Sequence, residues 1–169
     1  MSREAVETSR GPWTPPGALA RRAILRGART VALVGASSKP SRASHFVLTY
    51  LRSSSTDYEV WPVTPRETEV QGLKAYASLA DLPGTPDIVD VFRRPGDLPG
   101  VAEEAVAACA GTLWMQLGLH NDEAVRIGHE AELEVVSNRC LKIEHARFHG
   151  GLHLAGFDTG VISSKRALG

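Results

Sequence analysis

The chain has 169 residues, enough for one domain with a buried core, and its 43% hydrophobic and 22% charged residues are typical of a globular protein. Its 19 Lys and Arg residues balance its 19 Asp and Glu residues, so it lacks the basic surplus that nucleic-acid binding requires. The two cysteines, Cys109 and Cys140, cannot form a disulfide framework and match no zinc motif. Residues 1–16 lack the apolar core of a signal peptide, and no later run is long enough to span a bilayer. We therefore expect a cytoplasmic protein that binds neither nucleic acid nor a membrane.

The N-terminal quarter of the chain passes from a polar arm to apolar elements. Residues 1–16 are polar and end in a Pro-Pro pair, which predicts a loose arm. Residues 17–27 carry apolar side chains at helical spacing, which predicts a short helix. Residues 30–35 form a continuous apolar run that stops at glycine, as in a strand buried on both faces. Residues 41–52 predict a helix whose core-facing side chains are Phe46, Val47, Tyr50 and Leu51.

The same alternation of strand and helix continues through the rest of the chain. Further strands are expected at 58–63, 87–92, 112–117 and 134–137, and further helices at 98–110, 121–131 and 140–147. Residues 71–82 are irregular, with a short helix at 76–79. This order predicts an α/β, three-layer Rossmann-like fold with a central, mostly parallel sheet of five or six strands. The carboxyl ends of its strands would share one edge, where such sheets bind ligands.

The domain is expected to cover residues 17–147, followed by an extension over residues 148–169. This extension mixes apolar and turn residues. It either packs back on the domain or reaches a neighbouring subunit, as in a homodimer, and the sequence leaves both arrangements open.

The segment 34–45 joins the first strand to the helix after it, where a Rossmann domain receives phosphate groups. Gly35 permits a sharp turn before Ala36, and Lys39 adds a mobile cation. Hydroxyl groups and helix caps are offered by Ser37, Ser38, Ser41 and Ser44. The segment therefore predicts an anion-binding loop, against the simpler interpretation of a turn without a ligand.

The loop does not match the dinucleotide fingerprint G-x-G-x-x-G. Ser37 and Pro40 stand where its second and third glycines belong, and Thr64 ends the second strand with no acid at the tip. Arg66 lies just beyond that strand and could pair with a ribose phosphate, unless it is a solvated loop residue. Coenzyme A carries a ribose 3′-phosphate and NADP a ribose 2′-phosphate. Arg66 could pair with either group, so this residue alone does not distinguish the two cofactors.

The third and fourth strands also end in polar groups. Arg93 and Arg94 are placed to bind a diphosphate, and Phe92 to cover an adenine or a pantetheine chain. The two arginines could instead form ion pairs with Glu67, Asp97 or Glu103. Gln116 leaves the fourth strand, where it either contacts a ligand or caps the backbone.

Taken together, these strand ends resemble the coenzyme A-binding family of small Rossmann proteins, which is related to the nucleotide-binding domain of the succinyl-CoA synthetase alpha subunit. The resemblance covers about residues 20–147. It rests on the segments Val34-Gly35-Ala36-Ser37, Pro62-Val63-Thr64-Pro65, Asp90-Val91-Phe92-Arg93-Arg94-Pro95, Trp114-Met115-Gln116-Leu117-Gly118 and Asn138-Arg139-Cys140-Leu141-Lys142-Ile143-Glu144-His145.

The resemblance implies that coenzyme A is the cofactor. The implied contacts are Gly35, Ala36, Ser37, Lys39, Thr64, Arg66, Phe92, Arg93 and Arg94. The family often has Asn in place of Thr64 and Asp in place of Asn138, so this chain lacks the amide's donor-and-acceptor pair at the first position and a negative charge at the second. We predict a module that holds coenzyme A or an acyl derivative without catalysis. The alternative is an oxidoreductase that uses NADP or another nucleotide.

No catalytic group and no metal ligand is predicted. Succinyl-CoA synthetase works through a phosphorylated histidine in a second domain, which we do not expect here. Cys140 begins the last helix and could exchange disulfides with the thiol of coenzyme A, but a packed structural role is favoured. The series His145, His149 and His153 suggests a metal site, but Gly150-Gly151 would interrupt the helix. No Ser–His–Asp order stands out.

Overall fold

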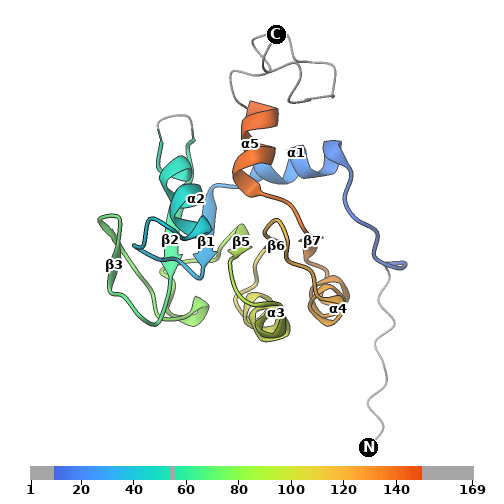
Figure 1. The fold of residues 1–169 in the computed structure, drawn as a ribbon. Helices are drawn as coiled ribbons and strands as arrows, with labels where there is room; N and C mark the ends of the chain where they lie inside the picture. The colour runs from blue at the N-terminus through green and yellow to red at the C-terminus, as the bar shows by residue number, and fades with distance from the viewer. Residues whose placement is uncertain (1–9, 54–55, 150–169) are drawn as a thin grey trace, which may run out of the picture.

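The apolar runs of the sequence form the strands of one parallel sheet in a computed structural model, which describes residues 10–53 and 56–149. The spatial order is β2-β1-β5-β6-β7, and each neighbouring pair is parallel (Figure 1). The bounds are Thr30–Val34 for β1, Glu59–Val63 for β2, Ile88–Val91 for β5, Thr112–Met115 for β6 and Glu134–Val136 for β7. The predicted Rossmann-like α/β class and its parallel sheet are confirmed.

Helices cover both faces of the sheet and complete three layers (Figure 1). One face carries α1 (Ala18–Gly27), α2 (Ala43–Leu51) and α5 (Leu141–His149). The other face carries α3 (Leu98–Ala107) and α4 (Asp122–Glu130), which pack against each other. Along the described part of the chain, no helix is both long and apolar enough to cross a bilayer.

Alternate residues of each strand supply two separate apolar cores. The core under α3 and α4 contains Ala32, Val34, Val89, Val91, Leu113 and Met115. The core under α1, α2 and α5 contains Val31, Leu33, Ile88, Trp114 and Val136. Because both faces are covered, the strands are apolar at successive positions instead of alternating with polar residues.

The core-facing stripe of α2 differs from the predicted one. Its buried residues are Ser44, Val47, Leu48 and Leu51, which recur at i, i+3, i+4 and i+7. Phe46 falls outside this stripe and is 58% exposed, so the prediction that it faces the core was wrong. The smaller Leu48 is fully buried in its place. Size and hydrophobicity favoured Phe46, but helical phase decides which side chain is buried.

The segment between β2 and β5 contains a hairpin that the sequence did not reveal. Strands β3 (Glu69–Val70) and β4 (Leu73–Lys74) pair in antiparallel fashion, and the short helix η1 lies at Leu79–Asp81, three residues later than expected. Gln71 and Gly72 connect the strands with φ angles of 51° and 78°. Successive positive φ values characterise the tight turns of two-residue hairpins, in which glycine is favoured at the second position.

Residues 10–13 lie along β7, although the sequence predicted a loose arm over residues 1–16. Arg10 Nη1 donates to the Leu133 carbonyl at 2.9 Å, and its Nη2 pairs with Glu134 at 2.9 Å. Trp13 Nε1 donates to the Val135 carbonyl at 3.1 Å. These side-chain donors occupy carbonyls on the edge of the sheet. Residues 1–9, and the predicted extension from residue 150 onward, lie outside the described residues.

A buried ion pair joins α1 to α5. Arg21 Nε lies 2.9 Å from Glu144 Oε2, and the two side chains are only 7% and 4% exposed. Arg21 Nη1 also donates to the Pro16 carbonyl at 2.7 Å. A buried pair of this kind stabilises the fold only while both partners are present, because either charge alone would be left desolvated.

Asp90 is a second buried acid, in the central strand of the sheet. It lies in β5 between Leu33 of β1 and Trp114 of β6, and it is fully buried. Among the described residues, neither carboxylate oxygen has a hydrogen-bond partner. Burial raises the pKa of Asp90 well above its ordinary value of 3.8. The folded protein therefore holds a proton on Asp90 at pH values where the unfolded chain has lost it.

We expect Asp90→Asn to stabilise the protein at neutral pH and to flatten the pH dependence of its stability. Because the folded pKa is raised, the stability linked to Asp90 is present below pH 3.8 and is lost as pH rises toward the folded pKa. Within that window the unfolding free energy falls by up to about 1.4 kcal/mol per pH unit. Urea unfolding between pH 4 and pH 8 would measure the slope. Asp57→Asn, at an exposed position, is the control, and equal slopes for the wild type and Asp90→Asn would contradict the assignment.

Candidate functional site

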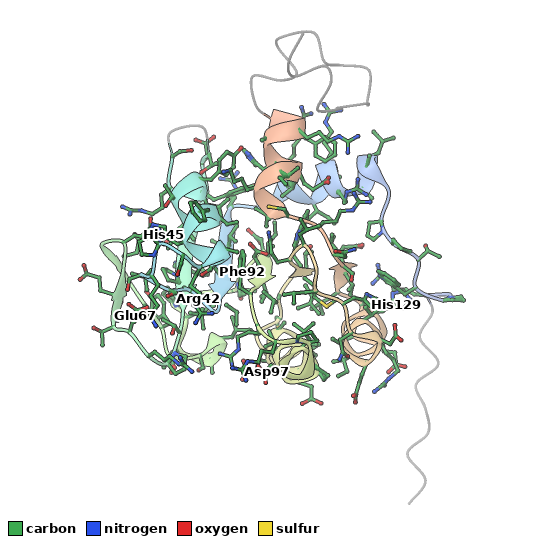
Figure 2. The ribbon with its side chains drawn as sticks, viewed as in Figure 1. Arg42, His45, Glu67, Phe92, Asp97 and His129 are labelled. Atoms are coloured by element: carbon green, nitrogen blue, oxygen red, sulfur yellow. The ribbon has the colours of Figure 1, made fainter. Side chains whose placement is uncertain are left out.

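A cavity of about 910 Å³ lies at the carboxyl edge of the sheet. It is lined by the residues that follow β1, β2, β5 and β6, together with the start of α2. Figure 2 shows Arg42, Glu67, Phe92 and Asp97 around this edge. In a parallel α/β sheet, the loops at the carboxyl ends of neighbouring strands enclose the ligand site.

The loop after β1 forms one wall of the cavity. Gly35 turns the chain with a φ of +88°, and its N–H donates to the Val63 carbonyl at 3.0 Å. Ser37 Oγ accepts a hydrogen bond from the Lys39 N–H at 3.1 Å. The loop leads into α2, whose N-cap residue Arg42 makes no side-chain capping bond. The amino-terminal N–H groups of α2 and its dipole therefore favour an anion at this end of the cavity.

Positive charge predominates in the cavity wall. Its five cationic residues are Lys39, Arg42, Arg66, Arg93 and Arg94. All five side chains are exposed, so they can reorient toward a bound anion. The acidic residues in the wall are Glu67 and Asp97. With three more positive than negative charges, the cavity suits a ligand that carries several phosphate groups.

Both acids of the cavity contact groups that could hold an anion. Glu67 Oε2 accepts a hydrogen bond from the Ser38 N–H at 3.0 Å, and Glu67 Oε1 accepts one from the Ser38 hydroxyl. The hydrogen bonds from Ser38 hold the pKa of Glu67 below its usual range. Asp97 lies 3.7 Å from Arg93, which is the ion pair that the sequence offered as an alternative to ligand binding.

Apolar side chains also line the cavity. Phe92 is half-buried and packs against the core under α1, α2 and α5, while Leu117 is 60% exposed at the rim. Gln116 is buried, and its Oε1 accepts a hydrogen bond from the Leu141 N–H at the start of α5 at 3.3 Å. Gln116 thus caps α5 and also lines the cavity. The cavity can therefore accommodate an apolar chain as well as anionic groups.

All eleven residues chosen from the sequence lie in the wall of this one cavity. They are Gly35, Ala36, Ser37, Lys39, Ser44, Thr64, Arg66, Phe92, Arg93, Arg94 and Gln116. The sequence did not single out Arg42, Glu67 or Asp97 as cavity residues. Arg42 could have been found from its place just before α2, whereas Glu67 is four residues past β2 and enters the wall only because that loop folds back toward Ser38.

The C-terminal candidates lie apart from the cavity wall. Cys140 is half-buried, packs against the core under α5, and is not a lining residue. His145 Nδ1 lies 2.7 Å from the Tyr50 hydroxyl. The side chain of His149 and the whole of His153 lie outside the described part of the chain. Within that part, no three His, Cys, Asp or Glu residues are grouped to hold a metal ion.

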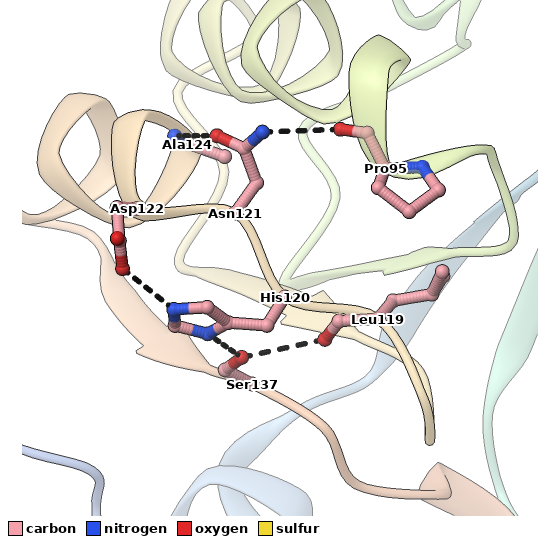
Figure 3. A network of polar contacts seen from close by, with 7 residues as sticks. All are labelled: Pro95, Leu119, His120, Asn121, Asp122, Ala124 and Ser137. Carbon is pink, nitrogen blue, oxygen red and sulfur yellow. Dashed lines mark hydrogen bonds and ion pairs between the residues drawn. The ribbon is translucent and has the colours of Figure 1, made fainter.

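A Ser–His–Asp contact forms between the loop after β6 and the end of β7 (Figure 3). His120 Nδ1 lies 2.6 Å from Ser137 Oγ, and His120 Nε2 lies 2.8 Å from Asp122 Oδ1. The side chain of Asp122 is fully exposed, so water competes for the carboxylate that would have to orient the imidazole. We assign these contacts a structural role, together with Asn121, which caps α4 and donates to the Pro95 carbonyl.

The fold and the cavity define a Rossmann-like domain with a predominantly cationic cavity at the carboxyl edge of its sheet, and comparison with known proteins gives its family. Residues 29–146 match the family described as CoA binding domain. The protein YneT of Bacillus subtilis is 42% identical over 123 residues, which cover 73% of this chain and 90% of YneT. The chain belongs to the CoA-binding domain family.

Two further relatives show how far the similarity extends. A hypothetical protein from Pyrococcus horikoshii has a solved structure with a TM-score of 0.75 and 36% identity, covering 82% of this chain and 99% of that one. The alpha subunit of the ADP-forming acetate–CoA ligase II of Pyrococcus furiosus is 40% identical over 60 residues. That match covers 36% of this chain but only 13% of the ligase subunit.

We expect Gly35→Ala to destabilise the protein by about 2–4 kcal/mol, because the backbone is strained and two loops would be forced apart. A Cβ atom at Gly35 would lie 2.1 Å from the Phe92 carbonyl oxygen, and the φ of +88° disfavours any side chain. Gly100→Ala, in the first turn of α3 with open space around the new methyl group, is the matched control. Equal melting temperatures for the two variants would show that the loop tolerates the change.

Proposed function

We propose that this protein binds coenzyme A or an acyl-CoA in the cavity at the carboxyl edge of its sheet, and that it holds the ligand without catalysis of its own. The observation that carries the proposal is the cavity wall, which combines five cations and the amino terminus of α2 with the apolar side chains of Phe92 and Leu117. Coenzyme A combines a diphosphate, a ribose phosphate and a pantetheine chain, so it requires both kinds of surface. Membership of the family supports the same ligand.

The residues of the cavity wall suggest where each part of coenzyme A binds. In this proposal, the diphosphate lies at the loop after β1, near Lys39 and Arg42, and takes hydrogen bonds from backbone N–H groups. Arg66, which follows β2, takes the ribose phosphate. Phe92 and Leu117 then cover the pantetheine chain or the adenine ring.

A dinucleotide cofactor is the second candidate, and the cavity favours it less. NAD has no ribose phosphate to pair with Arg66, and a dinucleotide loop normally carries two further glycines where Ser37 and Pro40 stand. NADP would satisfy Arg66 but not the glycine requirement. Of the two acids in the cavity wall, Glu67 lies nearer to β2 in the sequence, and it is bound to Ser38 instead of standing at the tip of that strand. An NADP-dependent oxidoreductase therefore remains the alternative that the binding experiment must test.

The proposal extends to the cofactor and not to a ligase reaction. The acetate–CoA ligase subunit matches this chain over only 13% of its own length, so most of that subunit has no counterpart in the alignment. The Ser137–His120–Asp122 contact ends in a solvated acid and lies beside the cavity, with no member among the lining residues. We accordingly propose a binding role for the described residues.

Thermal unfolding with coenzyme A, acetyl-CoA, NAD and NADP on ligand-stripped protein tests the function. A ligand at a hundred times its dissociation constant adds about 2.7 kcal/mol of stability, which a melting curve resolves. We expect a rise with coenzyme A, and a smaller rise in Arg66→Ala and Arg93→Ala. Arg26→Ala, an exposed arginine of α1 outside the cavity wall, is the control for the loss of charge.

Displacement of the bound ligand by 3′,5′-ADP and by 2′,5′-ADP distinguishes the two cofactors. Preference for 3′,5′-ADP would support coenzyme A, because its ribose phosphate is at the 3′ position. A melting shift with NADP alone, together with preference for 2′,5′-ADP, would make the oxidoreductase the better assignment. The absence of a shift with any of the four ligands would reject both.

A further inference from the structure

Glu67 occupies hydrogen-bond donors that belong to the anion-binding loop. Its two carboxylate oxygens accept from the N–H and from the hydroxyl of Ser38, the first of these at 3.0 Å. Ser38 lies between Ser37 and Lys39, in the loop that leads into α2. A carboxylate bound to a backbone N–H of this loop is an anion, as a phosphate is. It accepts hydrogen bonds from the same donors that a phosphate oxygen would use.

The surroundings of Glu67 show that it is held as an anion. Hydrogen bonds from Ser38 and the charge of Lys39 lower its pKa, so it is ionised at neutral pH. The second acid of the cavity, Asp97, likewise lies against a cation of the wall, Arg93, at 3.7 Å. Figure 2 places Glu67 and Asp97 at separate points of the cavity edge. Each acid therefore occupies a group that could bind an anionic ligand: Glu67 occupies the donors of Ser38, and Asp97 pairs with Arg93.

We propose that Glu67 is an internal competitor for the anion site, and that a phosphate group of the ligand must displace its carboxylate from Ser38. The inference rests on the proposed function for the identity of the ligand. It adds that Glu67 sets the affinity of the site and favours ligands that carry a phosphate group. A phosphate can carry two negative charges and three acceptor oxygens, so it can replace the single charge of Glu67. A ligand without phosphate gains nothing from the exchange.

The loop geometry makes this displacement structurally simple. Glu67 belongs to the connection between β2 and the β3–β4 hairpin, and it is half-exposed. Its side chain can leave Ser38 without disturbing the sheet, because the strand tips are joined by backbone bonds such as Gly35 N–H to the Val63 carbonyl. Displacement of Glu67 by a phosphate therefore needs only a change in the rotamer of Glu67 and hydration of its carboxylate.

Calorimetric titration of Glu67→Gln tests the inference. Glutamine keeps the size of the side chain but removes its charge, so the competitor weakens. We expect pyrophosphate and 3′,5′-ADP to bind roughly two- to fivefold more tightly to Glu67→Gln than to the wild type. Pantetheine, which has no phosphate, should bind both proteins equally. Glu69→Gln, an exposed acid of β3 outside the cavity wall, makes the same change in net charge and is the matched control.

The outcomes separate this inference from the proposed function. Tighter pyrophosphate binding by Glu67→Gln than by Glu69→Gln supports the inference, whether or not coenzyme A binds. Equal or weaker phosphate binding by Glu67→Gln overturns it, because Glu67 would then be neutral or would itself contact the ligand. Failure of every protein to bind coenzyme A, with the pyrophosphate effect intact, rejects the proposed ligand alone. Failure to bind any of these anions rejects both.

Discussion

The close approach of two backbones at the tip of β1 is the constraint on which the candidate site depends. Gly35 passes so near the Phe92 carbonyl that no side chain fits between them. Backbone hydrogen bonds from Phe92 to Val34, at 2.8 Å, and from Gly35 to Val63, at 3.0 Å, hold three strand ends together at this point. The loop after β1, the loop that contains Thr64 and the loop that contains Arg93 consequently line one cavity. The site is therefore set by main-chain geometry, while its side chains decide which ligand it accepts.

Much of this arrangement could be predicted from the sequence, because parallel strands with right-handed connections must end at the same edge. That rule brings Gly35, Arg66, Arg93 and Gln116 together without knowledge of any distance. The same reasoning could not find Glu67, whose position depends on how its loop folds back and on a through-space contact with Ser38. Nor could composition give the phase of α2 or the hairpin turn, which are decided by packing and by two positive φ angles.

The charged residues of the cavity are exposed, whereas other charged residues of the domain are buried. In the cavity, exposed cations outnumber acids, and the acids rest on groups that a ligand could take over. Away from the cavity, the Arg21–Glu144 pair is buried between α1 and α5, and the carboxylate of Asp90, in β5, is buried with no hydrogen-bond partner among the described residues. The exposed charges can exchange partners at little cost, whereas the buried ones cannot. The cations at the edge where the strands end are therefore available to the proposed ligand.

The contacts of residues 10–21 with β7 and α5 also have a consequence for how the chain folds. Trp13 bonds to Val135, and Arg21 to Glu144, across more than 120 residues in each case. During synthesis, these N-terminal residues must wait until nearly the whole domain has emerged before they can meet their partners. Contacts so distant in sequence slow folding, because a long loop has to close before they form. We therefore expect the N-terminal segment to join the structure late, although it is synthesised before its partners.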